Sequence, residues 1–303
     1  AVVKPAKPPP TTTTASELGC KSIDATLCSF KTLNKLTQET LLNNQNMTNF
    51  DQGNALQEQL ASQMPKDTNF NLALPETREK LTRMKAEERL EWAHKKFGRN
   101  FVLTTSFGIQ SAVLLNMISN LKKEHTPQVI WVDTGYLPSE TYVYAEQLID
   151  QLKLNIKVSQ STLSPARMEA LYGKLWETNS VKDLEKYHQI RKINPLEDTL
   201  NELKTICWGS GVRSTQTSLR KSMTYLDLIR ERLSLRPILE WTTKDIFYYM
   251  QENDLPQHPL FDKGYSTVGD WHSSGPDIKD EQGRNTRFGG LKEECGIHIP
   301  PNN

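Results

Sequence analysis

Two segments of the sequence bring together residue types that bind anions. The first is Ser106–Ser111, SFGIQS, in which Gly108 allows a close approach to the backbone and the serine hydroxyls add hydrogen-bond donors. If the apolar segment that follows is a helix, its first amide N–H groups point toward the same place. The second is Gly209–Arg220, GSGVRSTQTSLR, which offers two arginines and several hydroxyls. Both suit a phosphate or sulfate group, although an ordinary turn and a solvated loop are the plainer alternatives.

Neither segment matches the common nucleotide-binding motifs. The first loop lacks the lysine of GxxxxGK[ST] and the spacing of GxGxxG. The sequence therefore predicts an anion site, and excludes the P-loop and dinucleotide fingerprints as its basis.

A cysteine near the carboxyl terminus is the candidate nucleophile. Cys295 lies in a polar segment next to a glycine, and His298 and Arg287 favour its thiolate, whereas the glutamates at 293 and 294 oppose it. An incidental surface thiol is the alternative. Cys207, by contrast, lies in an apolar run and is expected to be a structural core residue.

Strands and helices alternate around these segments. We expect strands at 101–104, 129–132, 154–158, 205–208 and 233–239, and helices after Ser111 and at 139–152, 195–204 and 241–250, the last capped by Thr242 or Thr243. Residues 75–97 predict an amphipathic helix or helix pair that ends at Gly98. The chain becomes irregular after Pro256.

This alternation predicts an α/β fold with a doubly wound, mostly parallel sheet and a mobile C-terminal tail. Both anion-binding segments follow strands, so they should lie at the same edge of the sheet. Asp133 also follows a strand, in the segment Asp133-Thr-Gly135. It is either a turn or capping residue or a carboxylate that contacts a ribose hydroxyl.

Composition limits the class of protein. The chain has 303 residues, 36% hydrophobic and 24% charged, with a net charge of +1 and no apolar run that would span a bilayer. Nucleic acid and membranes are therefore not expected partners. The four cysteines are widely spread, which argues against a disulfide scaffold, a zinc ribbon or a four-thiolate cluster. Residues 1–68 predict a disordered or flexible extension, such as a transit remnant, and residues 69–303 a catalytic domain whose tail begins at about residue 270.

Taken together, the segments SFGIQSA, WVDTGYLPSET, GVRSTQTSLR, HPLFDKGYSTVGDWHSS and LKEECGIH resemble the phosphoadenylyl-sulfate (PAPS) reductase family of assimilatory sulfate reduction. The resemblance covers roughly 69–298. It implies an adenine-nucleotide α-hydrolase-like fold, and a reaction in which Cys295 attacks the sulfur of the activated sulfate to give an S-sulfocysteine. Thioredoxin or glutaredoxin then frees sulfite. No bound cofactor or metal is implied, and the expected assembly is a homodimer in the cytoplasm, or in the plastid stroma if the extension is a transit segment.

The resemblance also assigns residues. The substrate-binding set is Ser106, Phe107, Gly108, Gln110, Ser111, Asp133, Gly135, Lys192, Arg213, Gln216, Arg220 and Arg287, with His272 and His298 in supporting roles.

Two departures from the family pattern bear on the substrate. Residues 187–195 contain no cysteine where related adenylyl-sulfate reductases carry cluster ligands, which favours a cluster-free enzyme and the 3′-phosphorylated substrate. Ser214 and Thr215 stand where the family usually has a basic and an acidic residue, so adenylyl sulfate stays open as the substrate. The rivals are an ATP-pyrophosphatase-type ligase or sulfurylase subunit, whose SGGxDS loop is not found here, and a non-catalytic nucleotide-binding protein, which has no use for Cys295.

Overall fold

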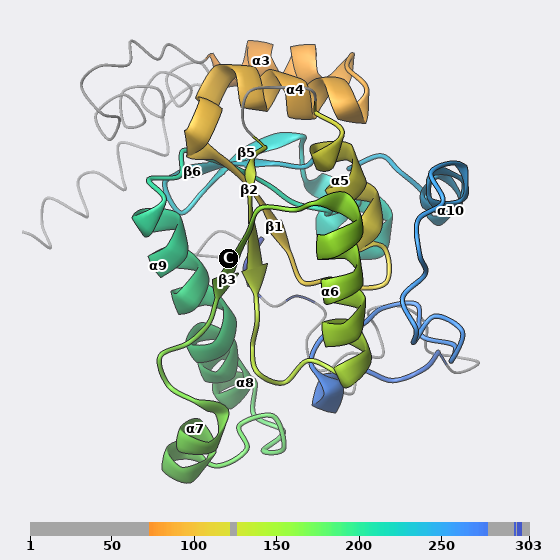
Figure 1. Ribbon diagram of the computed structural model, residues 1–303. Coiled ribbons are helices and arrows are strands. Elements are labelled where there is room, and N and C mark those ends of the chain that lie inside the picture. Colours follow the sequence, from red (N-terminus) through yellow and green to blue (C-terminus); the bar gives the residue numbers. More distant parts are fainter. Residues whose placement is uncertain (1–72, 122–125, 278–293, 295, 299–303) are drawn as a thin grey trace, which may run out of the picture. The chain divides into compact units, whose positions relative to one another are not determined.

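A six-stranded sheet carries the fold in this computed structural model (Figure 1). Its strands, in the spatial order β3-β2-β1-β4-β6-β5, are β1 (Phe101–Thr105), β2 (Gln128–Val132), β3 (Ile156–Ser159), β4 (Cys207–Gly209), β5 (Leu226–Ile229) and β6 (Arg232–Leu235). The structure describes residues 73–121, 126–277, 294 and 296–298, all within one compact unit of the chain. Neighbouring strands are parallel except β5, which pairs antiparallel with β6. The predicted mostly parallel sheet is confirmed.

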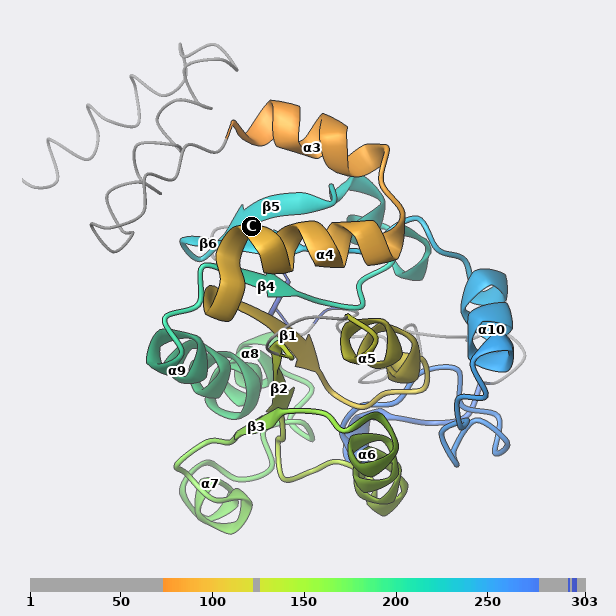
Figure 2. The ribbon, with the colours of Figure 1, turned by 45° about the horizontal axis from the view of Figure 1, so that its top comes forward.

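Helices cover both faces of the sheet (Figure 2). The helices α3 (Leu74–Thr82), α4 (Ala86–Phe97), α5 (Ser111–Ser119), α6 (Ser139–Leu152) and α10 (Thr243–Glu252) contribute to one core cluster, and α9 (Asn194–Glu202) to another. Side chains of β1 alternate between the two clusters, because Phe101 and Leu103 belong to the first and Val102 to the second. This alternation is what a doubly wound sheet requires.

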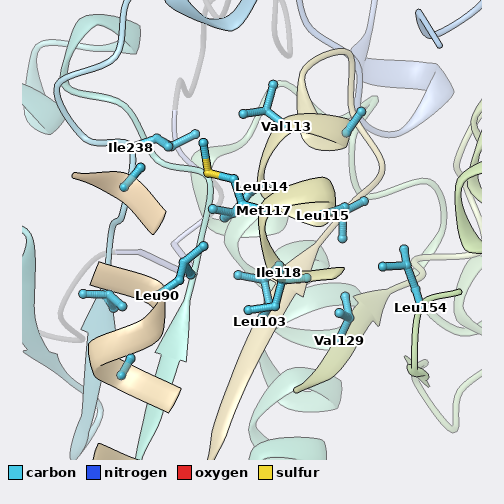
Figure 3. Packing of buried hydrophobic residues seen from close by; sticks show 14 of the residues in the cluster. Leu90, Leu103, Val113, Leu114, Leu115, Met117, Ile118, Val129, Leu154 and Ile238 are labelled. Atoms are coloured by element: carbon cyan, nitrogen blue, oxygen red, sulfur yellow. The ribbon is translucent and has the colours of Figure 1, made fainter. Parts of the chain in front are cut away.

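Apolar packing between β1 and α5 fixes the loop that joins them. Leu103 on β1 and Leu115 and Ile118 on α5 are almost completely buried, together with Val129 on β2 (Figure 3). Each such side chain stabilises the fold by about 1.5–3 kcal/mol. This packing fixes β1 and α5 relative to each other, and so fixes both ends of the SFGIQS loop between them.

Several predicted elements are confirmed. The helix pair α3 and α4 covers the predicted amphipathic segment, and Gly98 caps α4 with a φ of 53°. Thr242 caps α10, and its hydroxyl accepts a hydrogen bond from the Asp245 amide at 3.3 Å. The predicted extension 1–68 and much of the C-terminal tail lie outside the described residues. Within the described part of the chain, no helix has both the length and the apolar character needed to cross a membrane.

Two helices and one strand were not expected from the sequence. These are α7 (Pro165–Tyr172), α8 (Val181–His188) and β5. The predicted strand 233–239 also ends earlier, at Leu235, because the chain turns there and the Leu239 amide donates to the Arg236 carbonyl.

Candidate active site

A cavity of about 770 Å³ lies at the carboxyl ends of β1 and β4. It is lined by the SFGIQS loop after β1 and by residues 210–213 after β4. Since the two strands are parallel neighbours, both loops leave the sheet at the same edge. The expectation that the two anion-binding segments meet is confirmed.

The first loop presents its backbone and the start of α5 to the cavity. Gln110 occupies the N-cap position of α5 without making a side-chain capping bond, and the Ser111 hydroxyl donates to the Gly108 carbonyl at 2.8 Å. The Ser111 amide also donates to the Gly108 carbonyl, at 3.0 Å, so the amides available to a ligand are those that follow it in the first turn of this nine-residue helix. The backbone at Gly108 also meets a later segment, because a Cβ atom there would lie 3.4 Å from the Val268 carbonyl oxygen, an ordinary van der Waals contact.

Three basic side chains predicted for the site line the cavity, and two of them have a carboxylate partner. Lys192 Nζ lies 2.6 Å from Asp270 Oδ2. Arg220 forms a two-pronged contact with Glu294, with Nε 2.6 Å from Oε1 and Nη2 2.8 Å from Oε2. Both pairs are buried, so each carboxylate largely cancels the positive charge that its basic partner would present to the cavity.

Arg213 differs from the other two basic residues. It is 4% exposed, and no carboxylate of the described residues lies within ion-pair distance of its guanidinium. The guanidinium instead donates to the Gln110 side-chain oxygen, which joins the second loop to the first. Burial first, and then the neighbouring Arg220, lower the pKa of Arg213 to about 10. The cavity thus holds a desolvated positive charge that an anion would stabilise.

The C-terminal tail reaches the rim of the same cavity. Ile297 and His298 line it, and the His298 ring stacks on Trp208 of β4 with centroids 5.4 Å apart. Arg230 donates to the backbone carbonyls of Gly296 and Ile297. Cys295 and Arg287, the two remaining tail residues of the prediction, lie outside the described residues.

The cavity includes most of the predicted binding residues that the structure describes. Those that line it are Ser106, Gly108, Gln110, Ser111, Lys192, Arg213, Gln216, Arg220 and His298. Those that do not are Phe107, Asp133, Gly135 and His272.

The side chains outside the cavity have structural partners. The Phe107 ring is buried against Trp131, at 4.9 Å between centroids, and its backbone adopts a φ of 48°. His272 stacks on Trp176 at 4.0 Å and shares a hydrogen bond with the Tyr187 hydroxyl at 3.0 Å. These contacts make both residues supports of the site's surroundings.

Asp133 acts within its own turn. Its carboxylate accepts hydrogen bonds from the Gly135 amide at 2.8 Å, the Tyr142 hydroxyl at 2.7 Å and the Gln160 side chain at 2.5 Å. Of the two interpretations of Asp133, these contacts describe the turn residue. Gly135 has a φ of 73°, and a Cβ there would lie 2.7 Å from Pro165, so the turn requires glycine.

One cavity residue was missed at the sequence level. Asp270 is completely buried, lines the cavity and pairs with Lys192. It lies in the GDWHSS segment, in which the sequence analysis assigns a supporting role to the histidine, His272. The only sequence signal was this shared segment, because the pairing joins residues that are distant in the chain.

Comparison with known protein families matches residues 100–276, more than half of the chain, to the phosphoadenosine phosphosulfate reductase domain. The chain belongs to this family of oxidoreductases that act on sulfur. Among curated relatives, the phosphoadenosine 5′-phosphosulfate reductase of a Synechococcus strain is 51% identical over 228 residues, covering 75% of this chain and 97% of the relative. The enzyme of that name from a Synechocystis strain is 49% identical over 230 residues, covering 76% of this chain and 92% of the relative.

A solved structure supports the same family. The phosphoadenylyl-sulfate (PAPS) reductase of Candida auris, crystallised as a phosphate complex, is 25% identical, with a TM-score of 0.58 over 69% of this chain and 98% of the other. The expected adenine-nucleotide α-hydrolase-like fold and the expected family are both confirmed.

Proposed function

We propose that this protein reduces 3′-phosphoadenylyl sulfate to sulfite and adenosine 3′,5′-bisphosphate. Family membership and the names of the relatives support this assignment. The observation that carries it within the structure is Arg213, a buried cation with no described carboxylate partner, in a cavity that the tail segment containing Cys295 adjoins. A ligand with two anionic groups on a nucleoside suits the two loops that form this cavity.

The first chemical step is assigned to Cys295. Its thiolate attacks the sulfur of the phosphosulfate group, an S–S bond forms, the S–O bond to phosphate breaks, and the electron pair stays on the phosphate oxygen. The products are an S-sulfocysteine and adenosine 3′,5′-bisphosphate. The described residues on either side of Cys295 in the chain reach the site, because Glu294 pairs with Arg220 and Ile297 lines the cavity. Covalent catalysis of this kind divides a difficult transfer into two steps.

The two loops and their cations serve the leaving group. Negative charge builds up on the departing phosphate as the electron pair of the S–O bond moves onto its oxygen. Arg213 and the first-turn amides of α5 are suited to stabilise that charge, whereas the charge of Lys192 is largely offset by Asp270. Arg220 has a different role, because its guanidinium pairs with Glu294 and so holds the residue that precedes Cys295 in the chain.

The second step requires two electrons from outside the chain. A thiol of thioredoxin or glutaredoxin attacks the sulfur of Cys295 and releases sulfite, and the partner's second thiol resolves the mixed disulfide. The partner is oxidised to its disulfide and Cys295 is restored as a thiol. This sequence needs no iron–sulfur cluster, and we propose a cluster-free enzyme because the segment 187–195 has no cysteine.

A sulfite-release assay tests the proposal. The purified protein is supplied with reduced thioredoxin and with either 3′-phosphoadenylyl sulfate or adenylyl sulfate, and Cys295→Ser is measured beside it. We expect turnover of the 3′-phosphorylated substrate without added iron, and loss of turnover in the variant with nucleotide binding retained. A clear preference for adenylyl sulfate would favour the alternative substrate, and full activity of the serine variant would show that another group carries the reaction.

A further inference from the structure

A π-helical segment directs two consecutive basic residues into the protein. The segment η2 (Gln189–Ile193) joins α8 to α9, and both Arg191 and Lys192 within it are buried. Arg191 Nε donates to the Thr134 carbonyl at 2.7 Å, while Lys192 reaches Asp270. Such π-helical turns are rare, and they often occur at functional sites. The segment therefore places an ammonium group at the cavity wall.

Asp270 connects this ammonium to the turn after β2. One oxygen of its carboxylate lies 2.6 Å from Lys192 Nζ, and the other accepts a hydrogen bond from the Thr134 hydroxyl at 2.5 Å. The next residue continues the connection, because the Trp271 amide donates to the Tyr136 carbonyl at 2.7 Å. Asp270 is thus held from two sides, and its negative charge is fixed beside Lys192.

A carboxylate is an unexpected group in the lining of a cavity that binds anions. It cancels much of the attraction that Lys192 would exert, since the pair is buried and little screened by solvent. The cancellation has a use in the proposed reaction, because the 5′-phosphate gains a negative charge when the S–O bond breaks, whereas the sulfo group keeps its own charge on Cys295. An unopposed ammonium would hold that product tightly.

We propose that Asp270 is a counter-ion that limits the retention of the anionic nucleotide product by offsetting Lys192. The inference rests on the proposed function and deepens it. Asp270 acts through Lys192 and the field in the cavity, and it takes no part in bond making or breaking.

Equilibrium binding separates this role from a purely structural one. Adenosine 3′,5′-bisphosphate and uncharged adenosine are titrated by calorimetry into the wild-type protein, Asp270→Asn and Asp227→Asn. Asp227 is a matched control, because it pairs with the buried Arg236 and does not line the cavity. We expect Asp270→Asn to bind the bisphosphate about tenfold more tightly, since a neighbouring negative charge is removed, and to bind adenosine as the wild type does. The control should change neither affinity.

Two outcomes would overturn the inference. An Asp270→Asn variant that keeps or loses affinity for the bisphosphate, or that gains the same factor for adenosine, would show that the carboxylate does not act through charge. If the wild-type protein binds no bisphosphate at all, the proposed function fails first, and the inference fails with it.

A second pair of variants applies if Asp270→Asn does not fold. Lys192→Gln leaves the carboxylate without its cation, whereas Lys192→Gln with Asp270→Asn replaces both charges by neutral groups, which is better tolerated in a buried site. The double variant should bind the bisphosphate more tightly than the single variant. Equal or weaker binding by the double variant would contradict the inference.

Discussion

The desolvated charge of Arg213 predicts that this residue lowers the stability of the ligand-free protein. Its pKa falls from 12.5 to about 10, chiefly through burial. A lowered pKa for a base means that the charged form is disfavoured in the fold, and this lowering corresponds to about 3 kcal/mol. Arg213→Met removes that cost and also loses the contact with Gln110, worth about 1 kcal/mol. We expect a net gain of about 2 kcal/mol, or about 4–8 °C in the melting temperature for a domain of this size.

The same substitution should weaken ligand binding. A hydrogen bond to a charged group contributes about 1.5–3 kcal/mol, so the affinity for adenosine 3′,5′-bisphosphate should fall about ten- to a hundredfold. Thermal melts with and without the nucleotide measure both effects. Without nucleotide, the variant should have a higher melting temperature than the wild type. Adding the nucleotide should raise its melting temperature by less than it raises that of the wild type.

Arg236→Met is the matched control for this experiment. Arg236 is 1% exposed and its guanidinium pairs with Asp227, which also pairs with Arg78, so its removal takes one of two cations from this carboxylate. The control should lose about 1–3 kcal/mol of stability, because a charged hydrogen-bond partner is removed, and keep its response to the nucleotide. If Arg213→Met is also destabilised, or responds to the nucleotide as the wild type does, the view of Arg213 as an unsatisfied anion ligand is refuted.

Three further variants test other parts of the structure. Gly135→Ala should lose about 2 kcal/mol or more in chemical denaturation, because a Cβ would lie 2.7 Å from Pro165 at a φ of 73°; unchanged stability would mean that the turn rearranges easily. Burial lowers the pKa of His258 from 6.5 to about 4, so the folded protein excludes a proton that the unfolded chain binds, and stability should fall by at most about 3 kcal/mol as the pH drops from 6.5 to 4. His258→Gln should flatten that dependence, and an equally steep profile would assign it to other groups. Glu294→Gln should lower turnover about tenfold or more, because it removes the charge that pairs with Arg220 and so holds the tail; unchanged turnover in the sulfite assay would show that the pair does not position the tail.

The sequence predicts the central part of the fold because its signals there are local. The apolar run of β1, the small residues of SFGIQS and the apolar start of α5 follow one another directly, and the same holds for β2 and the turn after it. The helix α7, which the apolar periodicity does not predict, also has a local signal, since Ser164 caps it by accepting from the Arg167 amide and Pro165 follows the cap.

Other features have no signal of that kind. The hairpin between β5 and β6 turns at Arg230 and Glu231, both with positive φ, where glycine or asparagine would be expected. The tertiary pairing of the sheet outweighs the preference of these residues. The partners of Lys192 and Arg220, Asp270 and Glu294, are far away in the chain, so the sequence predicts the cations but not which of them are already neutralised.

The distinction between His272 and Asp270 follows the same logic. The resemblance to the family indicated a functional segment around them, and the segment does reach the cavity. Which side chain faces the cavity depends on the packing of His272 against Trp176 and on the tie between Asp270 and Thr134. That packing is set by tertiary structure alone.

Trapping the covalent intermediate tests the central claim most directly. The protein is mixed with 3′-phosphoadenylyl sulfate in the absence of any thiol reductant, digested, and analysed by mass spectrometry. The account predicts one added SO3 group on the peptide that contains Cys295, which disappears with sulfite release when reduced thioredoxin is added. A peptide that stays unmodified while the substrate is consumed, or an SO3 group on another residue, would contradict it.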